Sequence, residues 1–516
     1  MRINIWHNKL VVKSFAGKVR LWVLALTTPL LILVFANPMA FNFTIICMIP
    51  PEHAESDETM TIGQSVNSTA NSENFFSYDE KIIYDGRVYY DYSPLQRNAL
   101  FSSAALGLLL GTLPLSYCVG RYNVRYTFSA YAFISAVTTL LIPLSAELGY
   151  IYLFCLRILQ GIGSSAELMM ISSVPNEWSP IASAGTFMII LSTYYQVGPA
   201  LLMPTAAGLC ESQWGWSMVY YVQGSLTFIV VVLFFIFFRD SPREHPLVNQ
   251  KELTKIEKGK DVILKEKSEK RETVPYRAIF TDYMVWIAWL GFFGDELGYQ
   301  IFQQYGPLFL NKALGMNIQE IGFAAALPYI ISIATKLIAG PISDRMTCVS
   351  DRTRINIFAV ISQAGCIFCY ACLALFPTVM ADVPTWLLQA FYTPINMFCG
   401  LAFLGMYKSA AVIAKQYAHV TMTGLCTIQS LIMLILPLIV SLIVPDNSLE
   451  QWTRLFIAMP FIQTTTTIIF LIFCDSKPSS KFKPNAHLWM GQGDVVPCFS
   501  RDMQELNARI AVKNSY

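Results

Sequence analysis

Charged side chains are scarce in this chain. Asp, Glu, Lys and Arg make up 14% of its 516 residues, whereas a soluble domain averages about 25%. A chain of this length would need several domains in water, and its long charge-free runs would leave those domains without a polar face. The composition therefore excludes an ordinary soluble protein and favours a membrane protein.

Long stretches of the chain contain no charged residue at all. Each has at least roughly the 20 residues that a helix needs to cross about 30 Å of hydrocarbon. They are Leu21 to Pro51, Asn98 to Gly120, Tyr126 to Ala146, Trp178 to Cys210, Ser212 to Phe238, Ile355 to Ala381, Val383 to Tyr407, Gln416 to Pro445 and Leu455 to Cys474. Three further apolar spans contain charge, at about 148–176, 283–311 and 321–343. Because lipid offers no partner to open backbone groups, we predict an all-α membrane protein with twelve transmembrane helices.

The chain also lacks the motifs of energy-driven pumps and enzymes. It has no P-loop, no nucleophile–base arrangement and no convincing set of metal ligands. Cys366, Cys369 and Cys372 have metal-like spacing, but they lie in an apolar span without added histidines. We therefore expect no enzyme activity, no metal and no other cofactor.

Charge of one sign is also missing from alternate loops. Basic residues such as Arg121, Arg125 and Lys481 lie on one side of the predicted spans, and acidic residues such as Glu52 and Glu147 lie on the other. The positive-inside rule then predicts that both termini are cytoplasmic. An even number of spans leads to the same conclusion.

This orientation predicts how the chain is divided. We expect a cytoplasmic amino-terminal segment, a six-helix bundle with an outer loop at 52–96, a charged cytoplasmic linker, a second six-helix bundle and a cytoplasmic tail. The outer loop contains the sequon Asn67-Ser68-Thr69, which predicts glycosylation of Asn67. The other segments are 1–20, 21–238, 239–281, 282–474 and 475–516.

A weak internal repeat supports two related halves. Gly340-Pro-Ile-Ser-Asp344-Arg345 closes the eighth span, and Gly120-Arg121-Tyr-Asn-Val-Arg125 closes the second. Such turns mark corresponding points of parallel repeats. Two six-helix halves around a cavity at the middle of the membrane have the geometry of alternating access.

Five charged side chains lie well inside the predicted spans. Each costs roughly 2.5–3.5 kcal/mol at a helix centre, so such residues usually face a cavity or a partner. Arg157 is either a fixed cation that attracts an anionic solute or an arginine that snorkels or pairs locally. Asp295 and Glu296 are either ion-coupling groups or members of a structural ion pair. Because neighbouring helix positions point about 100° apart, we expect only one of the two to line a pocket.

Other polar residues complete the predicted site. For Glu167 and Lys336, and for Asp344 with Arg345, a gate or an inter-helix ion pair is favoured over solute contact. Glu296 shares one helical face with three glutamines, which indicates either a water-filled cavity or a helix-contact face. We expect these glutamines and a tyrosine of the fifth span to bind the solute: Gln300, Gln303, Gln304 and Tyr195.

Several short motifs resemble one family of transporters. Arg157-Ile-Leu-Gln-Gly161, followed by Asn176-Glu177-Trp178-Ser179-Pro180, is similar to the fourth span of the anion:cation symporter group of the major facilitator superfamily. This group is solute carrier family 17, which includes sodium/phosphate cotransporters, the sialic acid transporter and the vesicular glutamate transporters. The resemblance extends from about the second span to the twelfth, and includes Asp240-Ser241-Pro242-Arg243 after the sixth.

The resemblance implies a major facilitator fold and transport of small organic or inorganic anions driven by protons, sodium or membrane potential. Arg157 falls on the family's fourth-span arginine, which is implicated in anion recognition. The family's glutamate after that arginine is replaced by Ser164, and the arginine expected in its first span is replaced within Ala40-Phe41-Asn42.

We therefore predict a secondary active transporter, of symporter type, for a small organic anionic solute coupled to protons or sodium. Its expected partners are that solute, the coupling cation and the lipid bilayer, and not nucleic acid. The plasma membrane and lysosomal or vesicular membranes both stay open. The alternatives are a transporter of a neutral or cationic solute, which the two acidic residues of the seventh span favour, and a non-transporting sensor or scaffold that kept the fold.

Overall fold

The protein is described here by a computed structural model. It describes residues 18–49, 61–62, 81–84, 87–90, 92–180, 183–258, 276–346, 349–380, 383–407, 409–410, 413 and 418–473. The predicted glycosylation site Asn67 and most of the two predicted cytoplasmic termini lie outside these residues.

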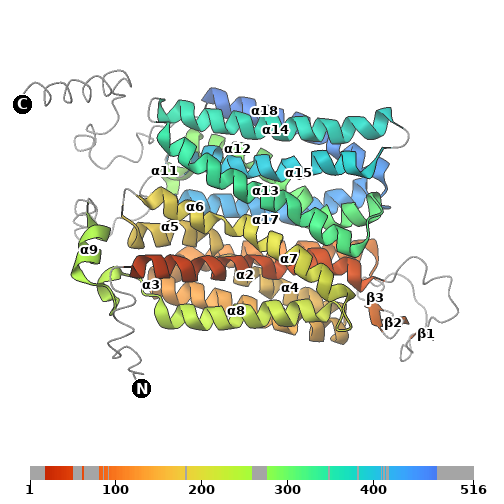
Figure 1. Ribbon diagram of the computed structural model, residues 1–516, viewed down its shortest axis with the longest axis horizontal. Helices are drawn as coiled ribbons and strands as arrows, with labels where there is room; N and C mark the ends of the chain where they lie inside the picture. The colour runs from red at the N-terminus through yellow and green to blue at the C-terminus, as the bar shows by residue number, and fades with distance from the viewer. Residues whose placement is uncertain are drawn as a thin grey trace, which may run out of the picture.

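The first half of the chain, whose helices are labelled in Figure 1, forms six spans from seven helices. The helix α3 contains two spans, which are joined at Asn123, where φ is 66°. The fourth span is made of α4 and α5, and the fifth of α6 and α7. The helices are α2 (Val19–Met48), α3 (Pro94–Leu148), α4 (Tyr150–Ser164), α5 (Glu167–Trp178), α6 (Ala184–Ser192), α7 (Tyr194–Glu211) and α8 (Ser217–Phe237).

The second half forms the other six spans. Two of its spans contain a π-helical turn: η5 (Phe309–Ala313) follows α12, and η6 (Phe403–Tyr407) follows α15. The helices are α12 (Tyr283–Leu308), α13 (Ile318–Arg345), α14 (Asp351–Val379), α15 (Thr385–Ala402), α17 (Ala418–Ile443) and α18 (Leu449–Phe473).

Eleven of the spans in the described part of the chain are long and apolar enough to cross a membrane by length and composition alone. The exception is α12, whose polar stripe lowers its hydropathy although its 26 residues are long enough. With α12 packed among the others, the prediction of an all-α membrane protein with twelve transmembrane helices in two six-helix halves is confirmed.

Short elements occupy the loops. A three-stranded antiparallel sheet lies between α2 and α3, in the order β1 (Thr61–Ile62), β2 (Lys81–Tyr84) and β3 (Arg87–Tyr90). Lys81 pairs with Tyr90, and Thr61 pairs with Ile83. The region between the halves contains a 3₁₀ turn, η4 (Pro242–Glu244), and two short helices, α9 (Gln250–Glu257) and α11 (Tyr276–Phe280).

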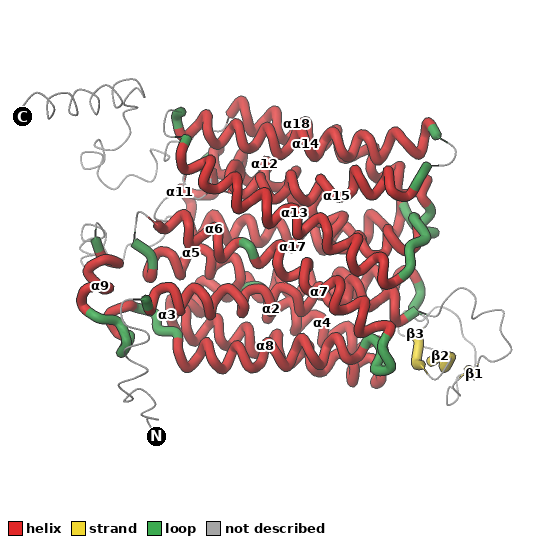
Figure 2. Tube along the Cα trace, viewed as in Figure 1, coloured by secondary structure: helices red, strands yellow, loops and turns green. Residues whose placement is uncertain are grey.

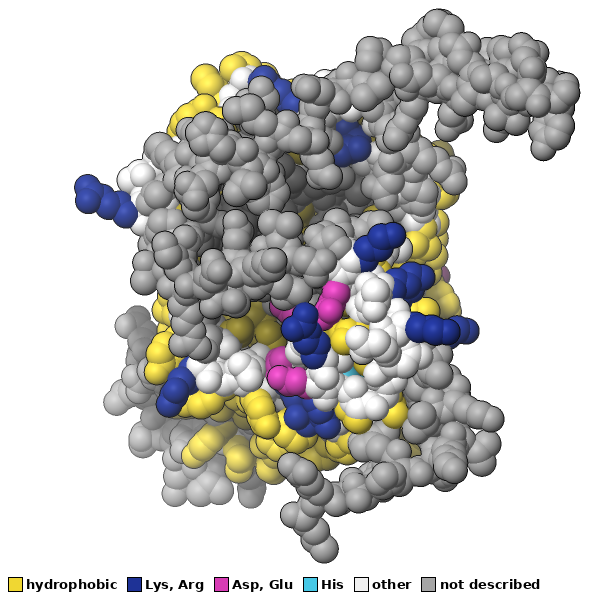
Figure 3. Space-filling model, turned by 90° about the vertical axis from the view of Figure 1, so that its left-hand side faces the viewer, with side chains coloured by type: hydrophobic (Ala, Val, Ile, Leu, Met, Phe, Trp, Pro, Cys, Tyr) yellow, Lys and Arg dark blue, Asp and Glu magenta, His cyan; other side chains and the backbone are white. Residues whose placement is uncertain are grey.

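The two halves lie side by side with their helices roughly aligned. Figure 1 shows α2, α4 and α8 in one half and α12, α14 and α18 in the other. The halves meet where α7 packs on α13 and where α3 packs on α17. The loops gather at the two ends of the bundle (Figure 2), with α9 at one end and the small sheet at the other. Figure 3 shows Lys and Arg side chains on the end that carries α9.

The segment after α8 is fastened to the first half. Asp240 accepts a hydrogen bond from the Arg125 backbone N–H at 2.8 Å, and the Arg239 carbonyl accepts one from Trp178 at 3.0 Å. On α9, the buried Glu252 accepts from the backbone N–H groups of Val19 and Arg20. Because these N–H groups belong to the first turn of α2 and have no partner within the helix, Glu252 caps that helix.

Candidate functional site

A cavity of about 690 Å³ lies between the two halves. The lining comes from both halves and is mostly apolar or aromatic, with a few polar groups. The polar side chains that line it are Asn42, Arg157, Ser164, Ser165, Glu167, Tyr194, Tyr195, Gln303, Gln304 and Gln429.

Arg157 is the cation of this cavity. Its side chain is 1% exposed, and its guanidinium carbon lies 4.6 Å from the centre of the Phe41 ring. Both hydrogen bonds that the described residues give it start from Nη1, which donates to the Pro38 carbonyl and to Gln160 Oε1 at 2.8 Å each. Nε has no partner among these residues. The arginine is held in place by neutral acceptors, and no described carboxylate neutralises it.

A network of polar side chains orients the Arg157 partner Gln160. Gln160 Nε2 donates to the Asn37 carbonyl at 3.1 Å and to Thr139 Oγ1 at 2.8 Å. The Asn37 side chain in turn donates to Ser135 and accepts from Thr227. Because the network joins four spans of the first half, it fixes where the guanidinium points.

Glutamines from the second half face the cavity from α12. Gln303 Nε2 contacts Met39 Sδ at 3.4 Å, and Gln304 Nε2 donates to the Met433 carbonyl at 3.3 Å. Their Oε1 atoms have no partner within the described residues. The cavity therefore offers amide oxygen acceptors opposite one guanidinium donor.

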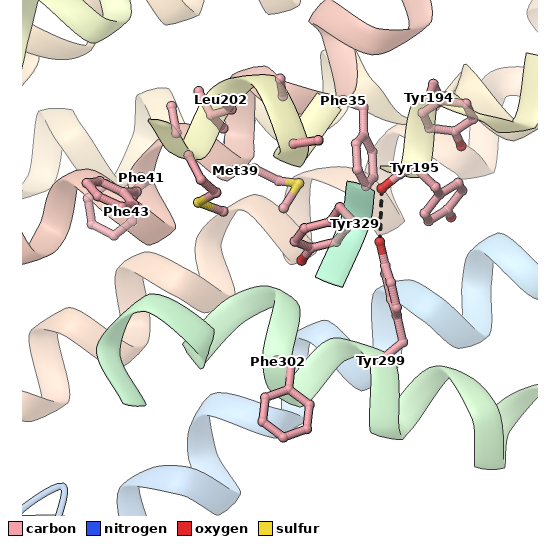
Figure 4. Packing of buried hydrophobic residues seen from close by; sticks show 14 of the residues in the cluster. Phe35, Met39, Phe41, Phe43, Tyr194, Tyr195, Leu202, Tyr299, Phe302 and Tyr329 are labelled. Atoms are coloured by element: carbon pink, nitrogen blue, oxygen red, sulfur yellow. Dashed lines mark hydrogen bonds between the residues drawn. The ribbon is translucent and has the colours of Figure 1, made fainter. Parts of the chain in front are cut away.

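Aromatic side chains form one wall. Figure 4 shows Phe35 of α2 beside Tyr194 and Tyr195 of α7, while Tyr299 reaches toward Tyr195 from the other half. The Tyr299 hydroxyl donates to the Tyr195 carbonyl at 3.1 Å, and the Tyr195 hydroxyl donates to Gln429 Oε1 at 3.0 Å. These bonds cross between the halves at the cavity wall.

The structure does not bring three of the predicted site residues to the cavity. Asp295 accepts a hydrogen bond from Gln363 Nε2 at 2.7 Å, inside the second half. Glu296 accepts from Gln300 at 2.6 Å and from the Tyr407 hydroxyl at 3.2 Å. Asp295, Glu296 and Gln300 are all buried, but none of them lines the cavity. The polar stripe of α12 thus divides, because only its carboxy-terminal members Gln303 and Gln304 line the cavity.

Glu167 and Lys336 lie in different surroundings. Glu167 lines the cavity, although the sequence favours a gate or an ion pair for it, and it has no ion pair among the described residues. Lys336 Nζ donates to the Ser192 carbonyl and to Gln196 Oε1 at 3.2 Å each, so this lysine of α13 contacts the first half. Asp344 and Arg345 are the last two residues of α13, and the structure does not describe their side chains.

The sequence did not predict several of the residues that line the cavity. Three of them are Asn42, Gln429 and Met39, which lie in charge-free spans. An amide or a thioether in such a span does not by itself indicate a binding site. Asn42 Nδ2 donates to the Gln303 carbonyl at 3.1 Å and so joins α2 to α12. An uncharged polar residue in a span was the available signal, but such residues are too common to point to one site.

Known proteins match this chain over most of its length. The model of the Major Facilitator Superfamily matches residues 30–437. The human sodium-dependent phosphate transport protein 1 is 26% identical over 410 residues, covering 77% of this chain and 84% of that protein. The probable small intestine urate exporter of Homo sapiens is 23% identical over 385 residues, covering 74% and 76%.

Solved structures share the fold. A D-xylose–proton symporter superposes with a TM-score of 0.60 at 14% identity, covering 89% of this chain and all of that one. A bacterial homologue of the human lysosomal transporter Spinster, in an inward-facing and occupied conformation, gives a TM-score of 0.58 at 15% identity, covering 88% and 96%.

Proposed function

Because this chain belongs to the major facilitator superfamily, as a divergent member of solute carrier family 17, we propose that it is a symporter for a small organic anion. The family and the relatives make it a membrane transporter rather than an enzyme. The anionic solute and the coupling to a cation are the proposal. Relatives named for phosphate and urate transport support it, since both solutes are anions.

The state of Arg157 carries the proposal. A buried charge without a partner is costly, and this guanidinium meets only neutral acceptors among the described residues. A solute carboxylate or similar anion entering the cavity would supply the missing negative charge. The planar guanidinium suits such groups because it donates two parallel hydrogen bonds.

The opposite wall supports an organic solute rather than a bare inorganic ion. Gln303 and Gln304 present unpartnered carbonyl oxygens, which accept hydrogen bonds from N–H or O–H groups. Phe35 and Tyr195 offer flat apolar surface beside them. An anion that also carries donors and an apolar or ring portion would use all three parts of the cavity.

The transport cycle would alternate access to this cavity. The first half, 21–238, and the second half, 282–474, would rock about it, with the end that carries α9 on the cytoplasmic side of a plasma, lysosomal or vesicular membrane. Contacts across the halves lie along its length, from Lys336 at the end near α9 to Tyr305 and Asn98 at the other. Breaking one set while keeping the other would open one side at a time.

Replacing Arg157 tests the proposal. Purified protein in liposomes is assayed with radiolabelled phosphate and urate, and unlabelled organic anions and cations are added as competitors. Arg157→Ala is expected to lower uptake about 100-fold, because each charge-assisted hydrogen bond contributes about 1.5–3 kcal/mol. Arg157→Lys keeps the charge but loses the planar fork, so an intermediate uptake is expected.

The control is Arg121→Ala, which removes an exposed arginine at the end that carries α9. It is expected to transport like the wild type. All variants are compared only where size-exclusion profiles match. Wild-type uptake by Arg157→Ala, or competition by organic cations and not by anions, would end the assignment of Arg157 to an anion.

A further inference from the structure

A second cavity, of about 420 Å³, lies between the two halves at the end that carries the small sheet. Its lining comes from the ends of α2, α12 and α17 and from the first turns of α3. Because the strands β1 to β3 connect α2 to α3, these helix ends lie on the sheet side of the bundle. The function proposed above assigns no ligand to this second cavity.

The polar side chains of the second cavity suit an anion. Arg97 is half-buried and is the only charged residue among the described residues that line it. Asn98, Ser441 and Asn447 add amide and hydroxyl groups. A guanidinium has five N–H donors and no acceptor, and amide and hydroxyl groups donate as well. Since a cleft lined by charge of one sign raises the local concentration of ligands of the opposite sign, the lining favours an anion.

Aromatic side chains separate the two cavities. Phe101 of α3 lines both of them. The centre of its ring lies 5.5 Å from that of Phe41 and 5.1 Å from that of Tyr305. Phe41 is the ring that the Arg157 guanidinium covers. A cation of the first half therefore lies on each side of this group of rings, Arg157 in the first cavity and Arg97 in the second.

A contact between the halves holds the rings in place. The Tyr305 hydroxyl, on α12, donates to Asn98 Oδ1, on α3, at 3.0 Å. Asn98 follows Arg97 in the sequence and lines the same cavity. Tyr305 and Phe101 belong to different halves, so separation of the halves at the sheet end would part these two rings. The barrier between the cavities therefore depends on how closely the halves approach each other.

We propose that the second cavity is an entry site, which binds the transported anion before it reaches Arg157. Arg97 is its cation, and Ser441 and Asn447 are further donors. The ligand is the same small organic anion, so the inference rests on the proposed function for the identity of its ligand. Separation of the halves at the sheet end would break the hydrogen bond between α3 and α12 and open the way from one arginine to the other.

Protection of a cysteine tests this site without any transport. Ser441→Cys, in a background without the native cysteines, replaces a hydroxyl of the cavity lining by a thiol of similar size. The purified protein is labelled with a maleimide in urate or phosphate, and in chloride of the same ionic strength. We expect urate or phosphate to slow labelling at least fivefold relative to chloride, because a bound anion covers the thiol. Labelling at one rate in all three anions would overturn the proposal.

Arg97→Gln should abolish the protection, because hydrogen bonds to an ionised donor are roughly twice as strong as neutral ones. Arg454→Gln is the matched control, since Arg454 begins α18 at the same end, is exposed and lies outside the lining. Arg157→Ala should keep the protection, because Arg157 lines the other cavity. Protection that survives Arg97→Gln but is lost in Arg157→Ala would assign the bound anion to the first cavity and overturn the entry site.

Uptake into liposomes then separates the entry site from the proposed function. Arg97→Gln should raise the half-saturating concentration of urate or phosphate about fivefold to tenfold, with a smaller effect on the maximal rate. A lower maximal rate at an unchanged half-saturating concentration would contradict an entry role. If Arg157→Ala takes up solute like the wild type while Ser441→Cys is still protected, the anion assignment of Arg157 fails and the site at Arg97 stands.

Discussion

The two halves handle buried charge in different ways. In the first half, Arg157 and Glu167 face the cavity with their charges unneutralised by described residues. In the second, Asp295 is bonded to Gln363 and Glu296 to Gln300 and Tyr407, away from the cavity. A buried charged side chain that faces a cavity and has no ion-pair partner indicates a binding role. A buried charged side chain that accepts hydrogen bonds from residues of its own half indicates a structural role.

The sharpest way to break this comparison is at Asp295. Gln363→Leu would leave the buried Asp295 carboxylate without its amide donor, at a cost of about 2 kcal/mol or more. We expect the apparent melting temperature to fall by about 2 °C or more. Asp295→Asn can still accept the Gln363 bond, so its melting temperature and its phosphate or urate uptake should stay close to those of the wild type. A stable Asp295→Asn without transport would show instead that this carboxylate belongs to the transport machinery.

Lys336 is an exception to this difference between the halves. It belongs to the second half, but its side chain donates hydrogen bonds to residues of the first half. Its burial against Ser192 and Gln196 holds only while the halves touch there. Gln196→Leu removes one acceptor and should favour separation of the halves. Lys336→Met removes a charge that water would stabilise in the open state, so it should favour contact.

The measurement is maleimide labelling of Ile189→Cys, beside Gly340 of the other half, in a background without the native cysteines. Gln196→Leu should raise the labelling rate and Lys336→Met should lower it, each by about fivefold to tenfold, or roughly 1–1.4 kcal/mol. Lys312→Met, at an exposed lysine beyond α12, is the control. Changes of the same sign in both variants would rule out a gate at this contact.

The smallest change in melting temperature is expected in the segment after α8, which is hydrogen-bonded to the first half. Burial lowers the pKa of His245 to about 4 from its usual 6.5. Its Nδ1 accepts from the Leu247 N–H at 3.2 Å, so the ring is neutral when folded. Because the folded pKa lies below the unfolded one, this histidine's contribution is complete above about pH 6.5 and is lost as pH falls toward 4.

The prediction is therefore a pH slope. Between pH 7 and pH 5, the melting temperature of the wild type should fall about 1–2 °C more than that of His245→Phe, which keeps a ring against Trp178 and Phe237. Equal slopes would mean that His245 does not titrate in this range.

The span pattern could be predicted because it follows from the thickness of the membrane. Charge-free runs marked nine spans, and interrupted runs marked the remaining three, including α12. The breaks between α4 and α5 and between α6 and α7 could not be read from the sequence, since neither contains glycine or proline at the turn. The strands β1 to β3 were also missed, because two to four residues are too few to show a period.

The site was predicted in part for a similar reason. A charged residue within a span is informative because its insertion into the membrane is unfavourable. Arg157 and Glu167 were therefore identified, although Glu167 was expected to form a gate or an ion pair. Helical spacing grouped Glu296 with Gln300, Gln303 and Gln304, but it could not tell which end of the stripe meets the other half. That depends on where α12 leaves its own bundle, which is a property of the packing.

The low hydropathy of α12 has a consequence for how the protein is made. During synthesis each span inserts into the membrane according to its own hydrophobicity. An acidic residue near the centre of a helix makes this insertion less favourable by roughly 2.5–3.5 kcal/mol. Asp295 and Glu296 both lie near the middle of α12. This helix is expected to integrate poorly when it emerges alone and to be retained by helices that follow, such as α14 and α18, which it contacts in the finished bundle.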